Sequence, residues 1–118
     1  MKFWTLHNGR IAVIELRGSL VGDGDTDRLR EIVSDFIEQG NKSLVINLQK
    51  VNYLNSTGIG ALISAHATYA KNGGQVRLVG IQNNVQNLLV ITKLIDVFEV
   101  DDTLEGAIEH FTESKSLN

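Results

Sequence analysis

Apolar residues follow two different periods along the chain, and the periods alternate. Short runs of branched apolar residues predict strands, whereas longer segments with apolar residues three and four positions apart predict helices. The clearest helix begins near Asp25 or Thr26 and ends near Gln39. One stripe holds its apolar residues, which are Leu29, Ile32, Val33, Phe36 and Ile37. Gly40 and Asn41 then separate this helix from a buried strand over residues 43–48.

The same criteria predict five strands and four helices in total. The strands are expected at residues 3–7, 11–17, 43–48, 75–79 and 97–100, and the helices at 25–39, 56–71, 84–95 and 104–111. Asn8-Gly9 predicts a hairpin between the first two strands, and residues 18–25 form a loop with three glycines. Strands alternate with helices after that hairpin. We therefore expect an α/β domain with a mixed, mostly parallel sheet of about five strands and an N-terminal hairpin at its edge, covered by about four helices.

Two adjacent hydroxyl residues lie where the central strand leads into a helix. Ser56 and Thr57 stand between Asn55 and Gly58 in the stretch VNYLNSTGIGA, residues 51–61. Asn, Ser or Thr at this place caps the free N–H groups of the helix. The same helix terminus also favours an anion such as a phosphate. Ser56 is therefore either a capping residue or a hydroxyl that is chemically modified.

The helix after these hydroxyls begins with a face of small residues. Its members are Gly58, Gly60, Ala61, Ser64 and Ala65. Small side chains leave the backbone accessible to close approach. This face either packs against another helix of the same domain or receives a partner protein. The helix at 84–95 presents a similar choice, because it carries apolar residues on more than one face: it is either buried on two sides or exposes an apolar strip.

Composition limits the class of protein. The 118 residues suffice for one domain with a real core, and 42% hydrophobic and 21% charged residues are ordinary globular values. We divide the chain into a domain at residues 1–112 and a polar C-terminal tail at 113–118. The net charge of −3 disfavours a nucleic-acid partner. No apolar run approaches the roughly 20 residues that span a bilayer, and no signal peptide is evident, so we expect a cytoplasmic protein without membrane insertion.

No pattern in the sequence predicts catalysis. His7, His66 and His110 are scattered over separate elements, and none of them neighbours a cluster of carboxylates. Ser56 lacks the G-x-S-x-G context of a hydrolase nucleophile. With no cysteine in the chain, a thiolate nucleophile and a thiolate zinc site are also excluded. We expect a protein without catalytic residues or cofactor.

One acidic stretch imitates part of a calcium loop. Asp23, Asp25 and Asp27 have the spacing of the first three EF-hand ligands. The required glycine is replaced by Arg28 and the bidentate glutamate by Ser34, so the pattern fails. Acidic residues at a helix N-terminus are the simpler interpretation, and we predict no metal site.

Residues 55–62, NSTGIGAL, resemble the D-S-[ST]-G-[LI]-G-x-L signature of STAS domains, and most of all that of anti-sigma factor antagonists (anti-anti-sigma factors). Other segments resemble family features too, and they occur in the family's order over nearly the whole chain. They are Arg17 to Leu20, the strand at 43–48, Gly73 to Leu78 and Ala107. Asn55 and Asn47 stand where the family usually has Asp.

The resemblance implies a binding switch. Ser56, with Thr57 as second choice, is expected to be phosphorylated by an anti-sigma factor that is also a serine kinase, and a serine phosphatase reverses the modification. The unmodified form would bind the anti-sigma factor and release a sigma factor for transcription. The expected partner-binding residues are Gly18, Ser19, Leu20, Asp23, Asn55, Ser56, Thr57, Gly58, Ile59, Gly60 and Ala61. Two alternatives stay open: a STAS subunit that regulates a membrane transporter, and a non-phosphorylated scaffold of a stress-signalling assembly.

Overall fold

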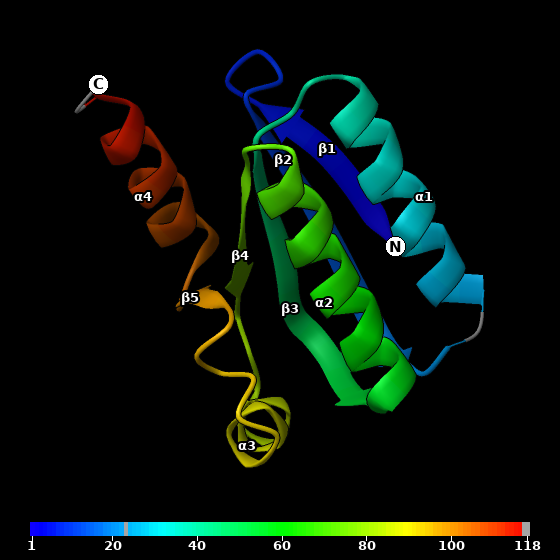
Figure 1. The fold of residues 1–118 in the computed structure, drawn as a ribbon. Helices are drawn as coiled ribbons and strands as arrows, with labels where there is room; N and C mark the ends of the chain where they lie inside the picture. Colours follow the sequence, from blue (N-terminus) through cyan, green and yellow to red (C-terminus); the bar gives the residue numbers. More distant parts are fainter. Residues whose placement is uncertain (23, 117–118) are drawn as a thin grey trace.

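The computed structural model describes residues 1–22 and 24–116, which form one mixed sheet with helices on both faces (Figure 1). The strands are β1 (Lys2–Leu6), β2 (Ile11–Leu20), β3 (Ser43–Leu54), β4 (Gln75–Val79) and β5 (Glu99–Asp101). They lie in the sheet in chain order, with β1 antiparallel to β2 and the other neighbours parallel. The predicted α/β class, the edge hairpin and the mostly parallel sheet are confirmed.

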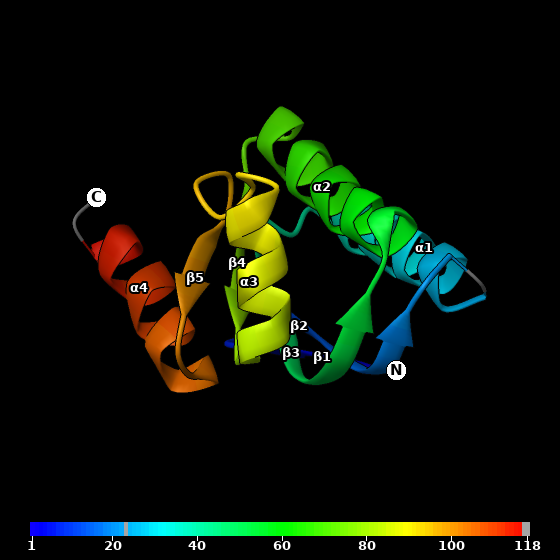
Figure 2. The same ribbon diagram turned by 90° about the horizontal axis from the view of Figure 1, so that it is seen from below.

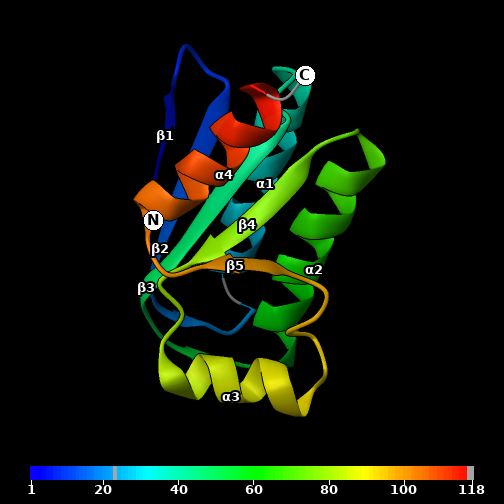
Figure 3. The ribbon, with the colours of Figure 1, turned by 90° about the vertical axis from the view of Figure 1, so that its left-hand side faces the viewer.

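Four helices connect and cover these strands. They are α1 (Gly24–Glu38), α2 (Ser56–Lys71), α3 (Asn83–Ile91) and α4 (Leu104–Ser116). Figure 2 shows α1 and α2 together on one side of the sheet and α4 apart from them. In Figure 3, α3 runs across the end of the sheet near the start of α2. Side-chain amides of Gln82 and Asn84 fix it there, because they donate to the carbonyl oxygens of Gln49 and Asn52 on β3.

Alternation along the strands divides the core into two clusters. On β2, Ala12, Ile14 and Leu16 face the larger cluster beneath α1, α2 and α3. Ile11 and Val13 point to the opposite face, where they join a smaller cluster with Ala107 and Phe111 of α4. A strand that is buried on both faces has few polar positions. This accounts for the unbroken apolar run at residues 11–14.

Two strands extend further than the sequence pattern predicted. β2 ends at Leu20 instead of residue 17, and β3 ends at Leu54 instead of residue 48. Their added segments pair through register shifts, one of which lies at Gly18, whose φ is +80°. A β-bulge places successive side chains out of step with the simple two-residue period. Gly18, Ser19 and Leu20 therefore belong to a bulged strand, and their assignment to a loop is wrong.

Two connections also differ from their predictions. The β1–β2 hairpin has a four-residue loop, residues 7–10, with positive φ angles at His7, Asn8 and Gly9. The hairpin is formed as predicted, but its loop is longer than the two-residue turn that Asn-Gly most often makes. Helix α3 ends at Ile91 rather than near residue 95, because Lys93 adopts a φ of +62° that a right-handed helix does not allow. α4 continues to Ser116, through the first residues of the segment assigned to a polar tail.

Candidate functional site

The stretch that carries the two hydroxyls forms the start of α2, directly after β3. Asn55 is the N-cap residue: its backbone is extended, and its Oδ1 accepts a hydrogen bond of 3.0 Å from the Gly58 N–H. This contact satisfies one of the free N–H groups of the first turn. Ser56 and Thr57 follow as the first two helical residues, and both are exposed. The capping role therefore belongs to Asn55, and the Ser56 side chain faces solvent.

The end of β2 and the first residues after it lie against this turn. Asn55 Nδ2 donates to the Val21 carbonyl oxygen at 3.0 Å, and the Asn55 N–H donates to the Leu20 carbonyl oxygen at 3.4 Å. Gly58 is packed even more closely, since a Cβ atom at this position would lie 2.1 Å from the Leu20 oxygen. A Cβ on Gly22 would lie 2.6 Å from Thr57 Cγ2. These contacts make residues 20–22 and the α2 N-terminus one continuous surface.

A groove of about 500 Å³ opens on the other side of the same turn, between β3, α2 and α3. We call it the α2–α3 groove. It is lined by Tyr53, Leu54, Asn55, Ser56, Ile59, Asn84, Val85, Leu88 and Thr92. None of these residues carries a charge at neutral pH, and the lining is mainly apolar. Ser56 thus stands at the rim of an uncharged groove, with its hydroxyl accessible from outside.

The family follows from a match that covers most of the chain. A model of the STAS domain matches residues 4–107. The chain belongs to the STAS domain family. The matched segment includes all of β2, α1, β3 and α2, and hence every residue of the turn described above.

Similar proteins include both antagonists and a sulfate transporter family protein. The anti-sigma-B factor antagonist of Bacillus subtilis (strain 168) is 32% identical over 81 residues, which cover 69% of this chain and 73% of the relative. An anti-sigma factor antagonist from Mycobacterium paratuberculosis has the same fold, with a TM-score of 0.75, 22% identity and 92% of each chain covered. A sulfate transporter family protein from Wolinella succinogenes aligns with a TM-score of 0.78, 23% identity, and coverage of 91% of this chain and 88% of that chain.

The predicted binding residues of this STAS domain divide by exposure. Exposed positions are Ser19, Ser56 and Thr57, and half-buried ones are Gly18, Asn55 and Gly60. Buried positions are Leu20, Gly58, Ile59 and Ala61, of which Ile59 still lines the α2–α3 groove. Asp23 lies outside the described residues. The structure brings the described ones together at one end of the sheet, but Leu20 and Ala61 offer almost no side-chain surface to a partner.

Sequence reasoning did not assign the α3 wall of the groove to the site. Asn84, Leu88 and Thr92 line it, although only the apolar character of more than one face of this helix hinted at such a role. Helix α3 is buried on one face and not on two, because its two buried residues lie four positions apart, and it exposes apolar side chains elsewhere. Val85 and Leu89 are buried, whereas Val90 is 52% and Ile91 is 77% exposed.

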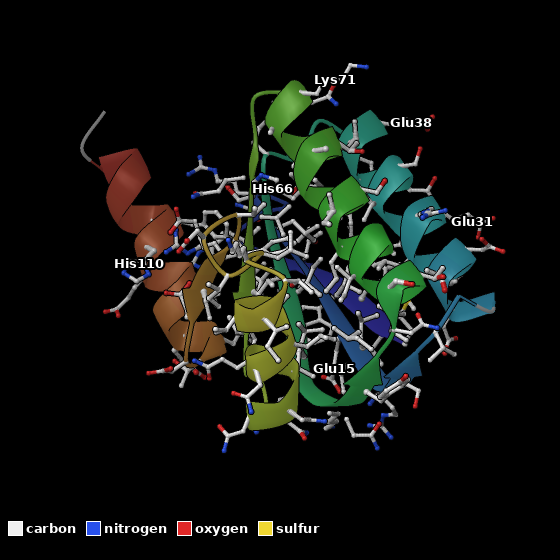
Figure 4. All side chains as sticks on the ribbon, turned by 60° about the horizontal axis from the view of Figure 1, so that its bottom comes forward. Glu15, Glu31, Glu38, His66, Lys71 and His110 are labelled. Atoms are coloured by element: carbon white, nitrogen blue, oxygen red, sulfur yellow. The ribbon has the colours of Figure 1, made fainter. Side chains whose placement is uncertain are left out.

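The small-residue face of α2 is used mainly within the domain. Ala61 and Ala65 are buried, and they line a shallow groove of about 200 Å³ with Leu29 and Val33 of α1. On another side of α2, the ring of His66 lies 5.7 Å from the Phe98 ring in an edge-to-face arrangement, directed into the domain (Figure 4). The packing interpretation of the small-residue face is confirmed for Ala61 and Ala65. The exposed residues of α2 lie at its two ends: Ser56 and Thr57 in the first turn, and Ala67, Ala70 and Lys71 towards the C-terminus.

Within the described residues, no helix combines the length and apolar character needed to cross a membrane.

Proposed function

We propose that this STAS domain is an anti-sigma factor antagonist that works as a phosphorylation-controlled binding switch, and that it has no catalytic activity of its own. In the unmodified form it binds a cytoplasmic anti-sigma factor that is also a serine kinase, so that a sigma factor is released. The binding surface consists of the exposed part of residues 18–22, the turn at 55–57 and the α2–α3 groove. A serine phosphatase restores the binding form.

One observation carries this proposal: the Ser56 side chain is exposed at the N-terminus of α2 while Asn55 performs the capping. The Ser56 hydroxyl is consequently not needed to cap the helix, and it is accessible to a kinase. A phosphate on Ser56 would add about −1.5 to −2 charges at neutral pH. Backbone N–H groups at a helix N-terminus and the helix dipole both favour such an anion. The modified domain should therefore stay folded.

The same phosphate should prevent docking. It would stand at the rim of a groove whose lining contains no cationic side chain to pair with it. A partner that covers the groove would have to desolvate a charge that no cationic side chain of the groove pairs with, which costs several kcal/mol. Phosphorylation is thus expected to act on the interface and not on the stability of the domain.

Three variants test the switch. Ser56→Ala should bind the anti-sigma factor in the presence of ATP as well as in its absence, and Ser56→Asp should bind more weakly while unfolding at the same urea concentration as the unmodified protein. Ser34→Asp, which adds the same charge at an exposed position on α1, is the matched control and should bind normally.

Affinity capture from the native cell identifies the partner, and mass spectrometry locates the phosphate. A phosphate on Thr57 with Ser56 unmodified would refute the assignment of the site.

The likeness to a sulfate transporter family protein supports a second candidate. In that case the domain would regulate a transporter at the membrane without phosphorylation of Ser56. Capture of a transporter instead of a kinase, with identical capture by Ser56→Ala and Ser56→Asp, would favour this function. Capture of a large, stable assembly without phosphorylation would instead indicate a scaffold.

A further inference from the structure

Asn55 makes hydrogen bonds to two segments that are far apart in the sequence. Its Oδ1 accepts from the N–H of Gly58 in α2, and its Nδ2 donates to the carbonyl oxygen of Val21, which follows β2. The Asn55 N–H adds a longer bond of 3.4 Å to the Leu20 carbonyl oxygen. This single side chain therefore links the turn that carries Ser56 to the other part of the proposed binding surface.

The two contacts require opposite hydrogen-bonding properties. Gly58 presents an N–H, which needs an acceptor, and Val21 presents a carbonyl oxygen, which needs a donor. A primary amide supplies both groups from one side chain. An ionised Asp could accept from Gly58 but would place a negative oxygen against the Val21 carbonyl. A Ser could still cap α2, yet it has neither the length nor the second polar atom to reach Val21.

The packing around this amide leaves little freedom for another arrangement. Thr57 lies against the backbone at Gly22, and Gly58 lies against the Leu20 carbonyl group. The backbone of residues 20–22 is thus in contact with Asn55, Thr57 and Gly58 of the turn. The amide of Asn55 supplies the only side-chain hydrogen bond between the two segments that the described residues show. If that bond is lost, the remaining contacts are van der Waals contacts and one long backbone bond.

We propose that Asn55 is a positioning residue: its amide holds residues 20–22 against the start of α2, so that the partner meets a preformed surface around Ser56. The proposal rests on the function proposed above for Ser56. It adds that in this chain, which has Asn where the family usually has Asp, both contacts require an amide and not simply any N-cap residue. A net hydrogen bond of ordinary strength corresponds to about a fivefold change in an opening equilibrium.

Amide hydrogen exchange measured by NMR on the full chain distinguishes two roles of Asn55: holding residues 20–22 against the start of α2, and capping α2. The N–H of residue 55 reports on the contact with residues 20 and 21, and the N–H of Gly58 reports on the cap. In Asn55→Ser, after correction for intrinsic rates, the residue 55 amide should exchange about fivefold faster and the Gly58 amide at the original rate. In Asn55→Asp the residue 55 amide should exchange faster still, with Gly58 remaining protected. In Asn55→Ala both amides should exchange faster.

Unchanged exchange at residue 55 in both Asn55→Ser and Asn55→Asp would overturn the proposal, whatever the partner is. A functional readout then uses the kinase obtained by affinity capture. A positioning role predicts that Asn55→Ser raises the KM for phosphorylation of Ser56 several-fold with little change in kcat, and that Asn55→Gln, which keeps an amide, is less impaired than Asn55→Asp. Equal KM values for all variants would also contradict it. If the chain without any substitution is not phosphorylated at all, the proposed switch is refuted. The exchange result would still decide whether Asn55 holds residues 20–22 against α2.

Discussion

Gly58 and Gly60 lie two positions apart on α2 but are glycines for different reasons. A Cβ atom on Gly58 would overlap the Leu20 carbonyl group, whereas a Cβ on Gly60 would meet nothing within 4 Å. Gly58 is therefore required by the close approach of α2 to β2. Gly60 leaves its side of the helix bare without any packing demand, and it carries the conformational cost that glycine has inside a helix.

Alanine substitutions should consequently have opposite effects at these two positions. Gly58→Ala forces α2 away from β2 and should lower the free energy of unfolding by about 2 kcal/mol, as overpacking usually does. Gly60→Ala should raise it by about 0.5–1 kcal/mol. Urea unfolding followed by circular dichroism measures both values. Equal effects of the two substitutions would show that the close approach at Leu20 is not required.

The choice of the capping residue illustrates what the sequence leaves open at this scale. Asn55, Ser56 and Thr57 all have a side-chain oxygen that is able to cap a helix. Only the backbone decides between them: Asn55 is extended, with φ −110° and ψ −174°, and the following residues are already helical. The sequence predicted that a cap lies here and that a hydroxyl is available, but not which residue performs which task.

At the scale of elements, Asp101 connects β4, β5 and α4. Its Oδ2 accepts a 2.6 Å hydrogen bond from Arg77 Nε, and its Oδ1 lies 2.6 Å from His110 Nδ1 on α4. Its side chain is only 5% exposed. The Arg77 guanidinium also lies over the ring of Phe111 at 5.8 Å. The three-residue strand β5 and α4 are therefore joined to the sheet by charge as well as by apolar packing.

Asp101→Asn should destabilise this edge of the molecule. It leaves the Arg77 guanidinium, whose side chain is 12% exposed, without its closest counter-charge, and we expect a loss of about 3 kcal/mol. The control is Glu99→Gln, since the Glu99 carboxylate lies 4.0 Å from Arg77 and is 61% exposed; this change should cost less than about 1 kcal/mol. Unfolding in urea, followed by the fluorescence of Trp4, measures both. A similar loss for the two variants would contradict the special role of Asp101.

Prediction of the elements succeeded where local periodicity decides and failed where a special backbone conformation intervenes. α1 and β4 were predicted almost to the residue, because an uninterrupted stripe and a short apolar run mark them. The bulge at Gly18 and the positive φ of Lys93 changed the ends of β2 and α3. The wall that α3 adds to the groove depends on how a helix lies across the sheet, which no local pattern contains.

At the scale of the whole molecule, one partly buried ion pair makes stability depend on pH. Lys50 Nζ lies 3.1 Å from Glu15 Oε1, and the Glu15 side chain is 15% exposed (Figure 4). This contact, reinforced by the charges of Lys2 and Arg17, holds the pKa of Glu15 below its usual value. A carboxylate whose pKa is lowered on folding stabilises the folded state above its unfolded pKa, and that stabilisation is lost as the pH falls through the folded pKa.

Glu15→Gln should therefore weaken the protein at pH 7 and have a decreasing effect as the pH is lowered from about 5 to 3. Urea unfolding at a series of pH values measures the difference from the unmodified chain. Glu31→Gln, which removes the 68% exposed carboxylate of a surface pair with Arg28, is the control and should change little at neutral pH. A difference between Glu15→Gln and the unmodified chain that stays constant from pH 7 to pH 3 would contradict this role.

The order of the strands in the sheet is also their order along the chain. Each strand after β1 is therefore synthesised after the neighbour with which it pairs. The carbonyl groups of residues 20 and 21, which contact Asn55, are likewise synthesised before the Asn55 turn. During synthesis on a ribosome, the first sixty residues already include every group that shapes the Ser56 turn. A nascent chain could form the surface around Ser56 before β4 and the C-terminal helices exist, and only the α3 wall of the groove would be added later.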